Sequence, residues 1–297
     1  MKDRAFAKIN LCLDVVGKRD DGYHELKMIM IPIEFYDVLE MLPANTTNLT
    51  INRSYLPVNE KNTIIRAIKI MRERYNFSLD FQCNLTKHIP TQAGLGGGSA
   101  DAAAAIRIMN RMLRLNMEEE EMLEVGALVG ADVPFCILNR PAFVEGMGDK
   151  ITPFRNTTDF KLLLVKPRKG VSTKEAFMIA DKECDVHPNC LTMMYALENN
   201  NYESVVHNLG NSLEEAAFGL VEDIYSVKNR MEGFGFDGVL MSGSGSTVFG
   251  ITRNEDLLNG AMEYFKGEKY FVRKTKPLLD YGYNNRRGNT KWRTQLF

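Results

Sequence analysis

Residues 90–101 have the sequence Pro-Thr-Gln-Ala-Gly-Leu-Gly-Gly-Gly-Ser-Ala-Asp, a glycine-rich turn between a predicted strand and a predicted helix. We expect the helix over Ala100–Leu113, because this stretch is rich in alanine and contains neither Gly nor Pro. Four glycines within positions 94–98 let the backbone approach a ligand closely. The helix that follows directs free N–H groups and partial positive charge at that ligand. The segment therefore predicts a phosphate-binding loop.

Two known phosphate-binding patterns do not match this loop. The Gly-Lys-Ser/Thr ending of a P-loop is missing, and so is the G-x-G-x-x-G pattern with an acidic residue about twenty positions later. A flexible loop that only packs the helix against the strand is the alternative interpretation. The immediate helix start and the hydroxyl of Ser99 favour a ligand site over that alternative.

Periodic patterns extend on both sides of the loop. Phe6, Lys8, Asn10 and Cys12 are predicted to share one face of an N-terminal strand, and residues 62–75 have helical spacing. A second glycine cluster, Ser-Gly-Ser-Gly-Ser-Thr at 242–247, separates two further predicted strands. Its small residues allow two backbones to pack closely and its hydroxyls can contact an anion, although a plain tight connection is also compatible with the pattern.

The overall composition excludes several classes of protein. The 297 residues include 37 Lys+Arg and 38 Asp+Glu, and a net charge of −1 argues against a nucleic-acid or membrane-surface binder. An apolar content of 44% indicates a globular chain. No apolar run approaches the roughly 18 residues that span a bilayer, and the N-terminus lacks a secretory signal. We therefore predict a cytoplasmic protein.

The five cysteines are scattered, odd in number and never spaced as C-x-x-C. We predict that they are reduced, mostly buried thiols with no disulfide or zinc role.

Three segments of the chain resemble the ordered motifs of the GHMP small-molecule kinase superfamily. They are Ala7-Lys8-Ile9-Asn10-Leu11, the loop at 94–101 and Ser242-Gly243-Ser244-Gly245. The resemblance implies an α/β (α+β) protein of two lobes with the site in the cleft between them. It implies a ribosomal protein S5 domain 2-like, ATP-binding lobe over 1–157. A ferredoxin-like lobe would follow over 158–297, ending in a basic tail at 281–297.

Four more segments resemble one branch of that superfamily. They lie at 17–26, 130–135, 145–148 and 209–214, so the resemblance runs from about residue 5 to 251. It implies ATP-dependent phosphorylation of the C2 hydroxyl of 4-(cytidine 5'-diphospho)-2-C-methyl-D-erythritol, a step of the non-mevalonate route to isoprenoid precursors. The implied cofactors are ATP and Mg²⁺. We expect a small-molecule substrate, no nucleic-acid or membrane partner, and a monomer or weak homodimer.

Two other functions remain open at this point. One is a kinase of the same superfamily acting on homoserine, mevalonate or a sugar. The other is a ligand sensor that has kept the fold and lost catalysis, although the presence of both Lys8 and Asp132 weighs against it.

The resemblance also implies roles for individual residues. Asp132 follows Ala131 and precedes Val133-Pro134-Phe135, an apolar setting in which a carboxylate requires a cation. Lys8 and Asp132 are therefore the implied catalytic pair, with a structural ion pair as the alternative. Whether Asp132 is a general base or an orienting group stays open.

The remaining implied site residues fall into two groups. ATP would be bound by Asn62, Ile64, Ile65, Lys87, Pro90, Ala93, Gly94, Leu95, Gly96, Gly97, Gly98 and Ser99, with Ser99 also a candidate metal ligand. The substrate would be bound by Asn10, Tyr23, His24, Ser172, Thr173, Phe177, Gly243, Ser244 and Gly245, where Tyr23 and His24 suit a pyrimidine base.

Overall fold

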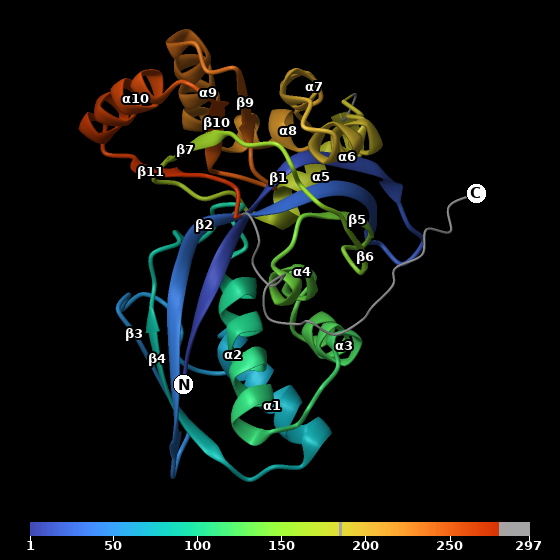
Figure 1. The fold of residues 1–297 in the computed structure, drawn as a ribbon, viewed down its shortest axis with the longest axis vertical. Coiled ribbons are helices and arrows are strands. Elements are labelled where there is room, and N and C mark those ends of the chain that lie inside the picture. Colours follow the sequence, from blue (N-terminus) through green and yellow to red (C-terminus); the bar gives the residue numbers. More distant parts are fainter. Residues whose placement is uncertain (184–185, 279–297) are drawn as a thin grey trace.

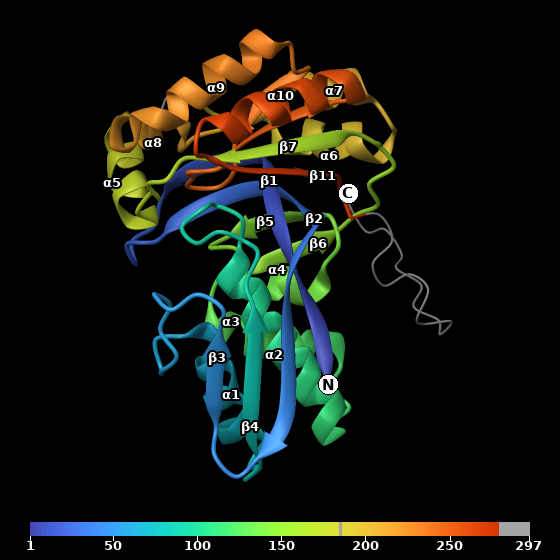
Figure 2. The same ribbon diagram turned by 90° about the vertical axis from the view of Figure 1, so that its left-hand side faces the viewer.

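A long antiparallel hairpin of strands β1 (Lys2–Lys18) and β2 (His24–Ala44) forms the centre of the computed structural model, which describes residues 1–183 and 186–278. Figures 1 and 2 show both strands running from the lower half of the molecule into the upper half. Two of the register shifts in this pair lie directly beside Lys8 and Asn10. Irregularities of this kind change the direction in which side chains point, and here they act where the polar residues of β1 occur.

The first sheet has the strand order β3-β4-β2-β1-β8, and β5 and β6 extend it beyond β2. These strands are β3 (Asn48–Ile51), β4 (Asp80–Thr86), β5 (Ala142–Gly146), β6 (Lys150–Pro153) and β8 (Gly210–Asn211). Helices α1 (Thr63–Tyr75), α2 (Gly97–Leu113), α3 (Glu119–Val129) and α4 (Val133–Leu138) gather in the lower half of Figure 1. Strand β8 pairs in parallel with β1, so the second half of the chain completes this sheet.

Local sequence explains where α1 and α2 begin. The side chain of Asn62 accepts a hydrogen bond from the N–H of Ile64 and caps α1, which confirms the helix predicted there. Helix α2 begins at Gly97, three residues before the predicted Ala100, because the N–H of Ala100 already donates to the carbonyl of Gly96. The alanines of α2 are buried and let the helix pack closely against β1 and β2.

The second sheet has the order β11-β7-β10-β9 and lies in the upper half of Figure 1. Its strands are β7 (Lys161–Lys166), β9 (Gly238–Met241), β10 (Val248–Thr252) and β11 (Phe271–Thr275). The accompanying helices are α5 (Thr173–Glu183), α6 (Cys190–Glu198), α7 (Tyr202–His207), α8 (Glu214–Leu220), α9 (Glu222–Phe234) and α10 (Glu255–Gly267). Within the described ranges, no helix combines the length and apolar character needed to cross a membrane.

The two sheets share the hairpin as a common wall. One buried cluster joins Ile9 and Ile31 of the hairpin to Leu164 and Phe249 of the second sheet. A second cluster joins the other side of the hairpin to α1, α2 and α4. The predicted α/β fold with two lobes is confirmed. The lobe boundary at 157/158 stays a prediction, and the basic tail at 281–297 lies outside the described residues.

The cysteine prediction is wrong at one pair. Cys12 on β1 and Cys190 at the start of α6 form a disulfide, with their Cα atoms 5.5 Å apart. The pair is separated by 178 residues along the chain, so only the docking of α6 on the hairpin brings it together. Cys83 and Cys136 are free and buried, as predicted, and Cys184 lies outside the described residues.

Replacement of Ile68 by Ala should lower the free energy of unfolding by about 2–5 kcal/mol, because it leaves a cavity in the core beneath α1. Ile68 is 2% exposed, whereas the neighbouring Lys69 points to solvent. Lys69→Ala is therefore the matched control and should change stability by less than about 0.5 kcal/mol. Urea denaturation of the three proteins measures both effects, and equal losses for the two variants would contradict this packing.

Candidate active site

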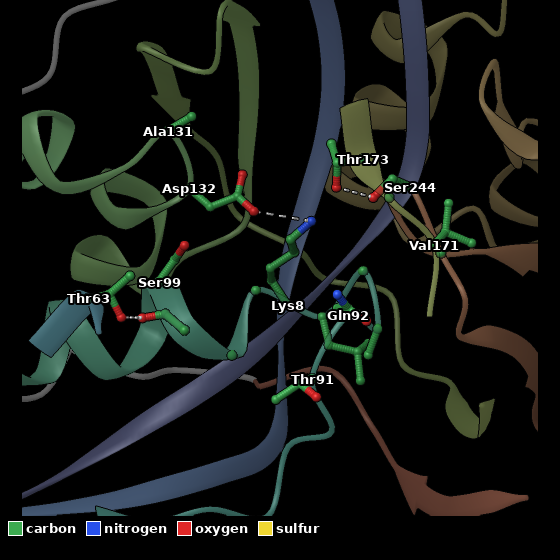
Figure 3. A pocket seen from close by; sticks show the side chains of 18 of the residues that line it. Lys8, Thr63, Thr91, Gln92, Ser99, Ala131, Asp132, Val171, Thr173 and Ser244 are labelled. Carbon is green, nitrogen blue, oxygen red and sulfur yellow. Dashed lines mark hydrogen bonds and ion pairs between the residues drawn. The ribbon is translucent and has the colours of Figure 1, made fainter. Parts of the chain in front are cut away.

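A cavity of about 900 Å³ lies where the hairpin, the two glycine loops and several helix starts meet. Figure 3 shows its polar side chains converging from β1, from the first turns of α1 and α2, and from both lobes. Helices α1, α2 and α5 all begin at its wall. Since helix N-termini carry partial positive charge and free N–H groups, the cavity is suited to anionic ligands.

The first glycine loop, residues 90–99, lies directly against the second, residues 242–246. A Cβ on Gly94 would be 1.8 Å from the carbonyl oxygen of Ser242, and Gly94 has a φ of +71°. The hydroxyl of Ser242 donates to the carbonyl of Gly94 over 2.9 Å. The N–H of Lys8 donates to the carbonyl of Leu95 over 3.0 Å. The two loops and β1 are therefore fixed to one another through their backbones.

Asn211 holds the second glycine loop from behind. Its amide nitrogen donates to the carbonyls of Met241 and Gly243, each over 2.8 Å, and the side chain is buried. Glu214 accepts the N–H of Met241 over 2.9 Å and pairs with Lys228. This explains why the segment at 209–214 belongs with the site, although it lies beneath the loop.

The start of α2 is open to the cavity. No side chain caps this helix, because its N-cap is Gly96, whose φ is +67°. A Cβ there would press against the aliphatic part of Lys8. The hydroxyl of Thr63, the first residue of α1, donates to the carbonyl of Gly98 over 2.7 Å and ties the two helix starts together (Figure 3).

Lys8 and Asp132 face each other across the cavity (Figure 3). The Nζ of Lys8 is 3.6 Å from an oxygen of Asp132 and donates to the Oδ1 of Asn10 over 2.7 Å. The Lys8 side chain is 6% exposed, whereas that of Asp132 is 35% exposed. A nearly buried cation thus lies beside a carboxylate that a ligand can reach.

Lys87 lies beneath the first glycine loop in a buried cluster of three charges. Its Nζ donates to Asp37 over 2.5 Å and to Asp101 over 2.6 Å. Burial lowers the pKa of Lys87, but the charges of Asp101 and Asp37 outweigh it and raise the pKa above its usual value. The ammonium group predicted to lie near ATP is therefore engaged by two carboxylates.

Of the two carboxylates in this cluster, Asp101 is in the less favourable environment. One of its carboxylate oxygens is buried without a hydrogen-bond partner. Burial raises the pKa of Asp101 to about 7, despite the opposing effect of Lys87, and the charge of Asp37 adds to the rise.

The opposite end of the cavity contains aromatic rings. His24, the first residue of β2, stacks on Phe177 of α5 with ring centroids 4.5 Å apart and planes inclined by 23°. Tyr23 precedes it and is 62% exposed. Nearby, the hydroxyls of Thr173 and Ser244 share a hydrogen bond of 2.8 Å. A flat ring and an anionic group can both be accommodated here.

The structure brings nearly all predicted site residues to this one cavity. Those that line it are Lys8, Asn10, Tyr23, His24, Asn62, Lys87, Pro90, Ala93, Gly94, Leu95, Gly96, Gly97, Gly98, Ser99, Asp132, Ser172, Thr173, Phe177, Gly243, Ser244 and Gly245. Ile64 and Ile65 do not line it. Ile64 is fully buried and Ile65 packs against the same core, because helical spacing turns both side chains inward under α1.

Several lining residues were not singled out from the sequence. Leu56, Pro57 and Lys61 line the cavity from the segment before α1, and Asp101 lines it from within α2. The carbonyl of Pro57 accepts from Asn62, which places this segment beside the helix start. Asp101 belongs to the predicted loop motif and could have been found by its position; the Leu56-Pro57 segment has no comparable pattern.

Comparison with known families agrees with this fold and site. Residues 62–140 match the family described as "GHMP kinases N terminal domain", and residues 193–270 match the family described as "GHMP kinases C terminal". These matches include α2 with its open start, Asp132, and the second glycine loop. The fold and site are those of a GHMP kinase.

More specific relatives define a branch of that family. The chain is 42% identical to a 4-diphosphocytidyl-2-C-methyl-D-erythritol kinase of Clostridium botulinum (strain Alaska E43 / Type E3), over 92% of this chain and 97% of the relative. It is 41% identical to the enzyme of that name from Clostridium beijerinckii, over 91% and 97%. The chain belongs to the 4-diphosphocytidyl-2-C-methyl-D-erythritol kinase family.

Solved structures give the same result at the level of the fold. A crystal structure of 4-(cytidine 5'-diphospho)-2C-methyl-D-erythritol kinase superposes with a TM-score of 0.78 and 30% identity, covering 93% of this chain and 99% of that one. A homoserine kinase from Cytophaga hutchinsonii superposes with a TM-score of 0.71 at 17% identity, covering 92% and 94%. The second likeness shows the shared fold alone.

The change in the free energy of unfolding caused by Asp101→Asn should be more favourable at pH 8 than at pH 5. The pKa of Asp101 is about 7 in the folded protein and near 3.8 in the unfolded chain, so the folded protein binds this proton more tightly. The contribution of Asp101 to stability is therefore complete below about pH 4 and lost as the pH rises through about 7. Urea denaturation at both pH values measures the difference. Exposed Asp159→Asn is the control, and a pH-independent difference for Asp101→Asn would contradict this burial.

Proposed function

We propose that the protein transfers the γ-phosphoryl group of ATP to the C2 hydroxyl of 4-(cytidine 5'-diphospho)-2-C-methyl-D-erythritol, a step of the non-mevalonate route to isoprenoid precursors. The observation that carries the proposal is the contact of 3.6 Å between Lys8 and Asp132 inside the cavity that the first glycine loop lines. The names of the Clostridium relatives and of the solved structure support this choice of substrate.

The nucleotide occupies the half of the cavity formed by the first glycine loop. The triphosphate meets the uncapped start of α2, where free N–H groups and the helix dipole stabilise negative charge. Lys87 supports this loop from below, since its ammonium group is held by Asp37 and Asp101. The adenine base lies towards Leu56, Pro57 and Asn62, which line the adjoining wall.

Lys8 and Asp132 prepare the acceptor alcohol. The free pKa of an alcohol is far above 7, so the hydroxyl proton must be accepted or oriented as the phosphoryl group transfers. Asp132 is accessible enough to contact that hydroxyl, and the ammonium group of Lys8 lies 3.6 Å from its carboxylate. Asn10 fixes Lys8 through a hydrogen bond of 2.7 Å, so the cation is positioned before the substrate arrives.

The cytidine-linked substrate, which accepts the phosphoryl group, lies in the opposite half of the cavity. The pyrimidine base lies near Tyr23, His24 and Phe177, where aromatic rings present flat faces. Its diphosphate runs past Thr173 and Ser244, whose hydroxyls are joined at the start of α5. The methylerythritol end then reaches Asn10 and the Lys8–Asp132 pair.

Magnesium completes the proposed chemistry. The described residues contain no cluster of three or more His, Cys, Asp or Glu that could hold a metal by itself. That is compatible with Mg²⁺, which in kinases is held largely by phosphate oxygens and water with one or two protein ligands. Ser99 lines the cavity with its hydroxyl oxygen and is the residue that would hold it. When bound, the ion would neutralise phosphate charge during transfer.

Three further proposals concern the oligomeric state, the location in the cell and the lobe boundary. We propose a monomer or weak homodimer, a cytoplasmic location, and a division of the chain into lobes at 157/158.

A kinase for homoserine or mevalonate is the competing function, since such enzymes share the fold. With Mg²⁺ and ATP, the purified protein should phosphorylate the cytidine-linked substrate and leave mevalonate and homoserine unchanged. Those smaller alcohols contain no base that could contact the His24 and Phe177 rings. A coupled assay of ADP release measures the turnover of each of the three alcohols. Comparable turnover of mevalonate would refute the assignment.

Asp132→Ala should lower kcat by about 10²–10⁴-fold, since it removes the group that handles the hydroxyl proton. The nucleotide should still bind, because the start of α2 is unchanged. Steady-state kinetics and calorimetric titration with ATP measure the two effects. Exposed Asp159→Ala is the control and should behave as wild type. Unchanged kcat in Asp132→Ala would remove this carboxylate from the mechanism and would favour a non-catalytic role for the site.

A further inference from the structure

His24 is held on two sides by one face of helix α5. Its ring stacks on Phe177, and its Nε2 lies 2.5 Å from an oxygen of Asp181. Phe177 and Asp181 are four residues apart on α5, a spacing that places both side chains on the same side of a helix. The stack sets the plane of the imidazole and the carboxylate sets its rotation within that plane.

Asp181 has a second partner that fixes its charge. Its other oxygen accepts from the Nζ of Lys18, the last residue of β1, over 2.6 Å. The hydrogen bond from Lys18 lowers the pKa of Asp181, and the one from His24 lowers it further. The side chains of Asp181 and His24 are only 18% and 14% exposed. Asp181 is therefore an ionised carboxylate, neutralised by Lys18, at the edge of the cavity.

The charge state of Asp181 dictates the tautomer of His24. An ionised carboxylate only accepts hydrogen bonds, so the Nε2 of His24 must carry the proton that lies between them. In a neutral imidazole the other ring nitrogen, Nδ1, is then an acceptor.

An acceptor on His24 distinguishes between the two common pyrimidines. Cytosine presents an amino group, a donor, at the position where uracil presents a carbonyl oxygen, an acceptor. A ring nitrogen that can only accept pairs with the cytosine amino group and repels the uracil oxygen. A site built in this way rejects the wrong base because its polar atom is left unpaired.

We infer that Asp181 is a specificity-determining positioning residue, which selects a cytosine over a uracil base by fixing His24 as the Nε2–H tautomer. The inference rests on the proposed function, in that His24 faces the pyrimidine. Asp181 does not touch the reacting atoms. Its effect is therefore on the choice of base and on KM, while the Lys8–Asp132 pair and the rate at saturation are unaffected.

The tautomer can be tested in the free protein, without substrate. The chain contains four His, so ¹⁵N NMR of histidine-labelled protein, with His24→Gln to assign the signal, reports on His24 directly. Wild type should show the Nε2–H tautomer, and Asp181→Ala should show a mixture. A wild-type His24 protonated at Nδ1, or an unchanged tautomer in Asp181→Ala, would overturn the inference.

The choice of base is tested by titrating CDP and UDP into each protein, and by comparing kcat/KM for the cytidine-linked substrate with that for its uridine analogue. Asp181→Ala should reduce discrimination by about 10- to 100-fold, with kcat for the cytidine substrate unchanged. Asp181→Asn keeps the shape but offers a donor and an acceptor equally, so discrimination should fall in the same direction. Exposed Asp223→Asn is the matched surface control.

The outcomes separate this inference from the proposed function. Equal losses for both bases would show a merely structural ion pair and overturn the role of Asp181, while the kinase activity stands. Retained CDP selectivity that depends on Asp181, in a protein that does not phosphorylate the cytidine-linked alcohol, would refute the proposed function and uphold Asp181.

Discussion

The backbone of Gly94 lies so close to the carbonyl of Ser242 that no side chain fits between them. This contact joins segments almost 150 residues apart, and the hydroxyl of Ser242 closes it by donating to the carbonyl of Gly94. Each glycine loop fixes the other, and both are hydrogen-bonded to β1 beside Lys8. The centre of the cavity depends on this junction, because it sets where the open start of α2 points relative to Lys8.

Charge is distributed unevenly around that junction. Beneath it, Lys87 is enclosed by Asp37 and Asp101, where no ligand is needed to balance the ammonium group. Above it, Lys8 has only the amide of Asn10 and a more distant carboxylate, Asp132. The first arrangement stabilises the loop, and the second leaves a cation and a carboxylate available to a ligand in the cavity. Two lysines of the same cavity wall thus serve different purposes.

The two ends of the cavity are formed by different parts of the fold. The glycine loops, Lys8 and Asp132 line the cavity, and the regions that match the GHMP kinase family include both loops and Asp132. The aromatic end is formed by the turn between β1 and β2 and by α5 of the upper lobe. In the proposed function this end would contact the base, while the Lys8–Asp132 pair would face the reacting alcohol. Solved structures of a homoserine kinase and a mevalonate kinase share this fold.

The sequence alone determined what is local. The glycine run followed by alanines and the helical spacing over 62–75 are patterns of neighbouring residues that located α1 and α2. The motifs that resemble the kinase superfamily located nearly all of the cavity lining. Only the tertiary structure decided which distant groups meet. The engagement of Lys87 by two carboxylates, the inward burial of Ile64, the Cys12–Cys190 disulfide and the contact of Asp181 with His24 all join residues through folding. Such contacts depend on how the helices dock on the hairpin, and the local pattern of residues along the sequence does not predict that docking.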